Sequence, residues 1–268
     1  MQPYILFTTV LYIMVMSLPA SAGELRDDLL FHASFEHTVN ADVAKGDAKC
    51  HMPPDKKQVL TYTLGIKGKA ASQNMSYASK GNILPEQGTL LMWVQPLTWQ
   101  ADDGGTVHFF QTNHVMRHGK LVSSLLLYKY RRVPPDQPAQ MWISNKLNVF
   151  AATAEERDGH IITRHENRIP VSISGWSIGE WHHLALSWNR ANGLVKLYVD
   201  GFHKGTSRMP LPEFFSGTFT IGGSHVPRND TAFDEVRIYN RPLTLDEIRG
   251  VLLEDKYREN SRIPESGE

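Results

Sequence analysis

The amino-acid sequence predicts an all-β protein, a two-sheet antiparallel β-sandwich with a short C-terminal helix. Segments between residues 179 and 240 alternate apolar and polar side chains with a period of two, which is typical of half-buried strands. Turn-forming residues separate these segments at intervals of about 8–12 residues, the spacing of sandwich strands. A helix-capping sequence that begins at Thr244 follows the last segment.

Two strands and a loop are predicted in the middle of the chain. Residues 107–110 and 121–128 are rich in aliphatic and aromatic side chains and are predicted to be strands. Residues 133–138 contain three prolines, which lack the backbone donor that a sheet needs, so they are predicted to form a loop. Binding residues often lie on such loops.

Four further strands are predicted after residue 180. Residues 181–188 and 194–199 each place alternate apolar side chains on one face, because successive strand side chains point to opposite sides of a sheet. These side chains are Leu184, Leu186 and Trp188 in the first segment and Val195, Leu197 and Val199 in the second. Asp200 and Gly201 then predict a two-residue hairpin turn with positive φ. Residues 218–223 and 233–239 are the last predicted strands.

The C-terminal helix is predicted over residues 245–253. Thr244 can cap it while Glu247 bonds back to the cap, and Leu243 and Ile248 are spaced as a hydrophobic staple. Residues 255–268 are charged and lack apolar periodicity, so we expect a disordered tail there.

The composition predicts one globular domain over residues 23–254. The chain has 268 residues, of which 41% are hydrophobic and 21% charged, within the usual range of a sandwich domain. Its 28 basic and 28 acidic residues leave no net charge to attract nucleic acid, which we exclude as a partner. Cys50 is the only cysteine, so no intramolecular disulfide can form and the hydrophobic core must hold the domain together.

Residues 1–22 are predicted to be a signal peptide. An apolar run covers residues 4–18, and Ala20, Ser21 and Ala22 supply the small residues that a signal peptidase requires. The run is short for a membrane span, which needs about 20 residues, although an anchor is the alternative interpretation. We therefore expect a secreted, periplasmic or cell-surface protein that has no membrane span after cleavage.

Four motifs in the C-terminal half carry a resemblance to a known family. They are GEWHHLALSWN at residues 179–189, LYVDG at 197–201, IGG at 221–223 and FDEVRIY at 233–239. In this order they resemble the laminin-G-like jelly rolls of the concanavalin A-like lectin/glucanase superfamily. Residues 29–36 are similar to the first strand of these domains, and residues 88–97 to an early strand that bears a tryptophan. The resemblance implies a jelly roll from about residue 29 to about residue 253.

The resemblance implies more than one function, because this sandwich is found in lectins, enzymes and adhesion modules. The leading hypothesis is an exported, non-catalytic module that binds carbohydrate or a cell-surface or matrix protein. A polysaccharide hydrolase and a structural or adhesive surface module are the alternatives.

Four residues of the middle region are the candidate ligand contacts. Sugar rings present C–H faces to aromatic planes, while their hydroxyls need fixed polar partners. Trp99 and Trp176 lie next to turn-forming residues and are expected to be exposed, and Tyr130 and Arg131 lie close together in sequence. For each aromatic residue, packing in the core is the competing interpretation.

Asp234 and Glu36 are the candidate metal ligands. Asp234 alternates with Val236 and Ile238, which would place its carboxylate on an apolar face, where a charge must be paired, hydrogen-bonded or bound to metal. A structural calcium ion held by Asp234, Glu36 and backbone carbonyls would satisfy it. The resemblance implies that such ions are common in the family. The alternative is that Asp234 accepts hydrogen bonds and ties the first and last strands together.

The sequence gives little support to catalysis. Glucanases of this superfamily resemble one another in a strand of alternating carboxylates, and this chain has none. The pairs Asp234-Glu235 and Glu155-Glu156 are adjacent, so on a strand their members would point to opposite faces. The twelve histidines show no transition-metal pattern. A hydrolase with carboxylates drawn from separate strands stays open.

Overall fold

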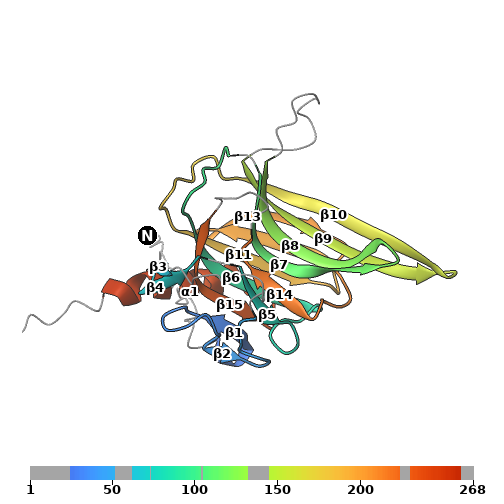
Figure 1. The fold of residues 1–268 in the computed structure, drawn as a ribbon, viewed down its shortest axis with the longest axis horizontal. Helices are drawn as coiled ribbons and strands as arrows, with labels where there is room; N and C mark the ends of the chain where they lie inside the picture. Colours follow the sequence, from blue (N-terminus) through green and yellow to red (C-terminus); the bar gives the residue numbers. More distant parts are fainter. Residues whose placement is uncertain are drawn as a thin grey trace, which may run out of the picture.

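The protein folds into two antiparallel sheets packed face to face, with one α-helix against the outer side of one of them (Figure 1). The computed structural model describes residues 25–51, 62–72, 74–103, 105–131, 145–223 and 230–260. The predicted signal peptide and the loop at residues 133–138 lie outside the described residues. No described helix is long and apolar enough to cross a membrane.

Among the residues that the structure describes, sheet A contains nine strands. Seven of them follow the order β13-β12-β11-β6-β15-β1-β2, while β4 pairs with β15 and β3 with β4. Their bounds are β1 (Leu29–Ala33), β2 (Val43–Ala44), β3 (Tyr62–Leu64), β4 (Lys69–Ala71), β6 (Gln87–Pro96), β11 (His182–Asn189), β12 (Leu194–Val199), β13 (Phe202–Arg208) and β15 (Thr231–Tyr239).

Sheet B contains six strands in the order β10-β9-β8-β7-β14-β5. Their bounds are β5 (Met75–Ala78), β7 (Gly105–Arg117), β8 (Lys120–Arg131), β9 (Lys146–Arg157), β10 (His160–Ser172) and β14 (Thr218–Ile221). A 3-10 helix, η1 (Arg26–Asp28), precedes β1, and the α-helix α1 (Leu245–Asn260) follows β15.

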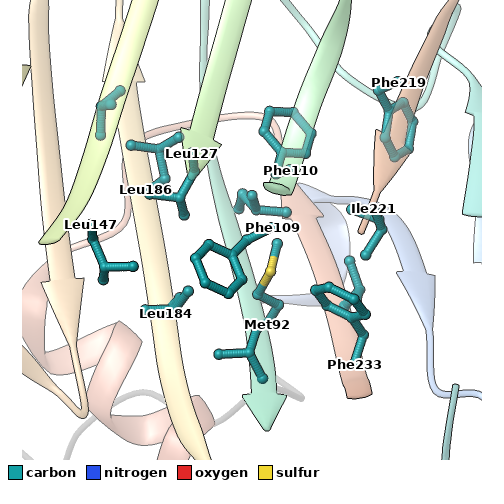
Figure 2. Close-up of a cluster of buried hydrophobic side chains, with 14 of the residues drawn as sticks. Met92, Phe109, Phe110, Leu127, Leu147, Leu184, Leu186, Phe219, Ile221 and Phe233 are labelled. Atoms are coloured by element: carbon teal, nitrogen blue, oxygen red, sulfur yellow. The ribbon is translucent and has the colours of Figure 1, made fainter. Parts of the chain in front are cut away.

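The main hydrophobic core lies between the two sheets. All six side chains predicted to share a face in β11 and β12 belong to it and are buried. Figure 2 shows Leu184 and Leu186 of sheet A close to Phe109 and Leu127 of sheet B. The period of two in the sequence thus identified the core face of these strands correctly.

A second cluster of buried side chains lies between the outer face of sheet A and α1. Leu91, Ala185 and Tyr239 of the sheet pack there with Ile248 and Val251 of the helix. Sheet A is therefore covered on both faces, which explains why every residue of β15 is buried.

The start of α1 has the predicted capping arrangement. Glu247 N donates to Thr244 Oγ1 at 3.2 Å, and Thr244 N donates to Glu247 Oε2 at 2.7 Å. The end of the helix was predicted wrongly. The helix continues to Asn260, and Asp255, expected to open a disordered tail, is fully buried against the sheet.

The sequence predicted one hairpin turn correctly but underestimated the strands of sheet B. Asp200 and Gly201 have φ values of 53° and 74° and form the expected turn between β12 and β13. In sheet B, β7 and β8 are 13 and 12 residues long, longer than predicted, and β9 and β10 were not predicted at all. The β9–β10 hairpin extends beyond the other strands at the right of Figure 1.

A bulge interrupts β15 at Glu235, whose φ is 49°. The pairing of β15 with β6 shifts between Asp234 and Arg237, so the alternation of side chains changes there. Phe233 and Val236 both face the main core, and Asp234 does not share their face. The predicted placement of Asp234 beside Val236 and Ile238 is therefore wrong, because the bulge adds one residue to the count.

Candidate functional site

The two predicted calcium ligands lie at a seam in sheet A, where the neighbour of β15 changes. Phe233 pairs with β4, whereas Val236 pairs with β1, and the bulge lies between the two pairings. Asp234, Glu36 and residues 65–69, which form the turn between β3 and β4, come together there. We call this group of residues the seam.

The Asp234 carboxylate is fully buried and accepts hydrogen bonds from the backbone. Lys67 N donates to its Oδ2 at 3.1 Å, and Glu235 N donates to its Oδ1 at 2.8 Å. Glu36 Oε1 accepts a longer bond of 3.4 Å from Lys69 N. Asp234 thus fastens β15 to the β3–β4 turn, rather than to β1 as its hydrogen-bonding interpretation supposed.

No described Lys, Arg or His forms an ion pair with Asp234. Burial raises the pKa of Asp234 to about 8, and the charge of Glu235 adds to this effect, while the backbone donors oppose it. Without a cation beside it, the carboxyl group is therefore mostly protonated at neutral pH.

Oxygen atoms converge on the space in front of Gly65. A methyl group built on Gly65 would lie 2.5 Å from Asp234 Oδ2, 2.6 Å from the Lys67 carbonyl oxygen and 2.7 Å from the Lys69 carbonyl oxygen. A methyl group on Gly68 would collide with the Glu36 carboxylate. Carboxylate and carbonyl oxygens are the ligands that Ca²⁺ prefers, so the donor set at the seam has the chemistry of a calcium site.

The remaining ligands at the seam would come mostly from carbonyls and solvent. Within the described ranges, no three His, Cys, Asp or Glu side chains are grouped closely enough to hold a metal ion. The seam therefore offers two carboxylates, both predicted from the sequence, packed closely around a turn in which residues 65 and 68 must be glycine.

A buried ion-pair network lies next to the seam, under α1. Arg237 donates to both carboxylate oxygens of Asp255 at 2.9 Å and also pairs with Glu235. Lys67 Nζ donates to Asp255 at 2.6 Å, and Trp93 Nε1 donates to it at 3.0 Å. Burial opposes ionisation of Asp255, but Arg237 and Lys67 outweigh it and lower its pKa to about 2.

This network joins α1 to sheet A and is closed to large ligands. Asp234 and Asp255 are fully buried, and Glu235 is 3% exposed. A polysaccharide cannot reach these three carboxylates, so they do not form the catalytic pair that the hydrolase alternative requires.

A groove with charged walls lies on the inner side of the β9–β10 hairpin. It consists of two adjoining hollows of about 540 Å³ and 290 Å³, which share Arg164, Met209 and Pro210. The other residues that line it are Thr153, Ala154, Glu155, Thr163, His165, Glu166, Arg190, Arg208, Leu211 and Glu213. We call it the hairpin groove.

The inner face of the hairpin changes from apolar to polar along its length. Ala151 belongs to the main core, and its cross-strand partner is Glu166. Two residues further out on the same face, Thr153 pairs with Arg164, and Glu155 follows. These side chains line the groove instead of packing on sheet A, because the hairpin extends past the apolar core.

The opposite wall of the groove is held firmly. Met209 N donates to the Gly193 carbonyl at 2.9 Å, which joins the segment after β13 to the turn between β11 and β12. Met209 and Leu211 are buried, and Pro210 beside them is half-buried. An apolar floor with polar walls is the usual composition of a site that binds a small molecule or sugar.

Trp99 and Trp176, predicted to be exposed ligand contacts, are buried. Trp99 is 0% exposed, and its Nε1 donates to Thr231 Oγ1 at 2.8 Å. Trp176 is 8% exposed and stacks on His182, with 4.1 Å between the ring centres. Both rings also pack against Phe109, so core packing, the competing interpretation, is correct for both.

Tyr130 and Arg131 continue strand β8, where their backbones pair with Thr106 and Gly105. Their side chains lie outside the described part of the structure. The sequence analysis missed the hairpin groove. A signal for it exists in the charged residues of segment 153–166, but it has meaning only once the pairing of the two strands shows which of them share a face.

The sequence profile of the laminin-G-like family of the concanavalin A-like lectin/glucanases superfamily matches residues 69–249. The matched residues make up more than half of the chain and include most of both sheets. The chain belongs to this superfamily. The jelly-roll resemblance carried by the four sequence motifs is thereby confirmed. No curated protein sequence matches the chain.

Solved structures similar to this superfamily member include bacterial binding domains. The receptor-binding domain of botulinum neurotoxin C/D mosaic serotype matches with a TM-score of 0.57 and 11% identity over 89% of this chain and 52% of that chain. The binding domain of botulinum neurotoxin DC in complex with SialylT matches with a TM-score of 0.56 and 14% identity over 86% of this chain and 51% of that chain. The chain thus spans about half the length of these neurotoxin structures.

Domain 4 of AbnA, a GH43 extracellular arabinanase from Geobacillus stearothermophilus, was solved in complex with arabinotriose. It matches with a TM-score of 0.56 and 19% identity over 82% of this chain and 96% of that domain. At these identities the likeness concerns the fold alone.

Proposed function

We propose that this protein is an exported, non-catalytic binding module that recognises carbohydrate in the hairpin groove. The observation that carries the proposal is the inner face of the β9–β10 hairpin, where Thr153, Glu155 and Arg164 replace the apolar residues of the core. Hydroxyl, carboxylate and guanidinium groups can bind sugar hydroxyls, while Met209 and Pro210 offer an apolar floor to the C–H face of a ring.

The solved neighbours support a binding role. One neurotoxin binding domain was solved with SialylT and another with rat synaptotagmin II, while the arabinanase domain was solved with arabinotriose. A cell-surface or matrix protein is therefore the alternative partner. The glutamates of the walls, Glu155, Glu166 and Glu213, favour carbohydrate, since glutamate is depleted in protein interfaces.

A glycan array followed by calorimetry tests the proposal. The protein is expected to bind at least one glycan class, and Arg164→Ala is expected to weaken that binding by about tenfold or more, the effect of losing a hydrogen bond to a charged group. Arg157→Ala removes another exposed arginine of the same hairpin that does not line the groove, and it should bind as the unchanged protein does. Equal losses in both variants, or no glycan binding at all, would overturn the proposal.

We also propose that the seam holds a structural calcium ion through Asp234, Glu36 and the carbonyls of Lys67 and Lys69. When bound, the ion supplies the positive charge that the buried Asp234 lacks. The seam lies near β3, β4 and α1 at the left of Figure 1, whereas the tip of the β9–β10 hairpin lies at the right. The ion would therefore stabilise the fold without contacting the sugar.

Thermal unfolding with calcium or with a chelator tests this second proposal. Calcium at 100 times its dissociation constant should stabilise the protein by about 2.7 kcal/mol. Asp234→Asn, which keeps the shape of the side chain but not its charge, should lose most of this response. A response of the same size in Asp234→Asn, or none in the unchanged protein, contradicts a calcium ion at the seam.

A further inference from the structure

We propose that the sugar bound in the hairpin groove carries a carboxylate, as a hexuronic acid or a sialic acid does, and that Arg208 binds this carboxylate. The inference rests on the proposed function, because it specifies the ligand class of the same groove. It follows from which arginines of the groove have a carboxylate partner within the protein and which do not.

Arg164 already has a carboxylate partner within the protein. Its Nη2 lies 2.9 Å from Glu155 Oε1 in a hydrogen-bonded ion pair on the hairpin. The charge of Arg164 is therefore balanced before any ligand arrives. We assign it to the binding of sugar hydroxyls.

Arg208 has no such partner among the described residues. Within the described part of the chain, its guanidinium makes one hydrogen bond, from Nη1 to the Asn192 carbonyl at 2.7 Å. A guanidinium has five N–H donors in a fixed plane, so most of its donors are left for a ligand. Arg208 lines the larger hollow, together with Arg164 and Met209.

The Arg208 side chain is held in position before a ligand binds. Its bond to Asn192 and the bond from Met209 N to Gly193 fasten the end of β13 to the turn between β11 and β12. A planar guanidinium fixed by one corner is suited to pair side by side with a carboxylate, which has matching geometry.

The smaller hollow also has an arginine on its wall. Arg190 lines it and forms an ion pair with the exposed Glu86 at 3.8 Å, which is too long for a hydrogen bond. Two acids line this hollow, Glu155 and Glu213. Glu155 is already paired with Arg164, and Glu213 is exposed, so solvent and salt weaken its repulsion.

The larger hollow has one acid, Glu166, against Arg164 and Arg208, whereas the smaller one has two acids. We therefore place the carboxylate in the larger hollow beside Arg208 and the next sugar of a chain in the smaller one.

Matched pairs of oligosaccharides test the inference by calorimetry. The pairs are an oligogalacturonate and its methyl ester, which has the same rings without the charge, and a sialylated oligosaccharide and its asialo form. We expect one acidic member to bind at least about tenfold more tightly than its neutral partner, since a hydrogen bond to a charged group contributes this much or more.

Two variants assign the preference to Arg208. Arg208→Gln should reduce the acid-to-neutral ratio to about one, and Arg208→Lys, which keeps the charge without the planar pair of donors, should leave an intermediate ratio. Arg157→Gln makes the same change of charge outside the groove and should keep the full ratio. Arg208→Lys also serves as the folded comparison if Arg208→Gln proves unstable.

The outcomes separate the inference from the proposed function. Equal binding of acidic and neutral members, or an acidic preference that survives Arg208→Gln, overturns the inference and leaves the carbohydrate module standing. Failure to bind any member of the pairs or any glycan of the array overturns both. If the acidic member binds more tightly than its neutral partner in only one of the two pairs, that pair identifies whether the ligand carries a hexuronic acid or a sialic acid.

Discussion

Asp255 holds α1 to the sandwich through three donors, from Arg237, Lys67 and Trp93. Removing a buried partner leaves the remaining charges uncompensated, which typically costs about 3–5 kcal/mol. Asp255→Ala is therefore expected to lower the free energy of unfolding in urea by about this amount. Asp246→Ala, an exposed acid in the first turn of the same helix, should cost less than about 1 kcal/mol. Equal effects would show that the network contributes little.

Asp234 should make the calcium-free protein less stable as the pH rises. Its pKa is about 8 in the folded state against a usual value of 3.8, so the folded state holds a proton that the unfolded state has lost. The stabilisation is complete below pH 3.8 and is lost as the pH rises through 8, with a slope of up to about 1.4 kcal/mol per pH unit.

His183 has the opposite effect on the free energy of unfolding, and at lower pH. Burial lowers its pKa to about 4 from 6.5, so its stabilisation is present above pH 6.5 and is lost as the pH falls through 4. The effect of Asp234 should therefore be clearest between pH 6.5 and 8. Urea unfolding in a chelator should give a falling free energy in this window, and Asp234→Asn should flatten it. An unchanged slope in the variant would contradict the assignment.

Single residues were predictable only where the local pattern determines their surroundings. Asp234 stands out as an acid in an apolar strand, and it is indeed buried, although the bulge reverses its face. Asp255 lies in a charged segment and offers no such signal. Its burial depends on Lys67, which is 188 residues away in the chain. The prediction that Trp99 and Trp176 are exposed was wrong for the same reason. Turn-forming neighbours in the sequence do not reveal which distant rings will cover a side chain.

The capping box of α1 can be tested with Thr244→Ala. The variant loses the side-chain oxygen that accepts from Glu247 N, which should cost about 1 kcal/mol in urea unfolding. Thr206→Ala, at an exposed position of edge strand β13 where the hydroxyl contacts His203 at the surface, serves as a comparison and should cost less. A loss below about 0.3 kcal/mol for Thr244→Ala would mean that packing alone fixes the start of the helix.

At the level of elements, the sequence predicted β11, β12, β14, β15 and the start of α1, because each has a local period and a marked turn. It did not predict β9 and β10. Their outer halves carry charges on the inward side, so the apolar alternation that identifies a strand ends where the core ends. The same feature forms the hairpin groove, and the candidate ligand site was therefore missed together with its strands.

For the whole molecule, the groove should be separable from the fold. Ala152 and His165 are cross-strand partners, so an Asn-Gly turn can replace residues 153–164 and close the hairpin at its core end. Leu147, Val149 and Ala151 remain in place, and the unfolding temperature should change by no more than about 4 °C, which corresponds to about 1 kcal/mol.

Carbohydrate binding in this shortened protein should be lost, because one wall of the groove is gone. Far-UV dichroism should still show a β-rich protein. Retained binding would place the ligand elsewhere on the molecule, and a collapse of the unfolding temperature would show that the hairpin is part of the core.

The chain enters and leaves the sandwich on one side. Leu25, before η1, packs with Ile248 and Val251 of α1 on the outer face of sheet A. In Figure 1, α1 lies far from the tip of the β9–β10 hairpin. A protein engineer could therefore graft these residues into a loop of a carrier enzyme or scaffold with both junctions on the same flank. The β9–β10 hairpin would then extend into solvent, away from the host protein.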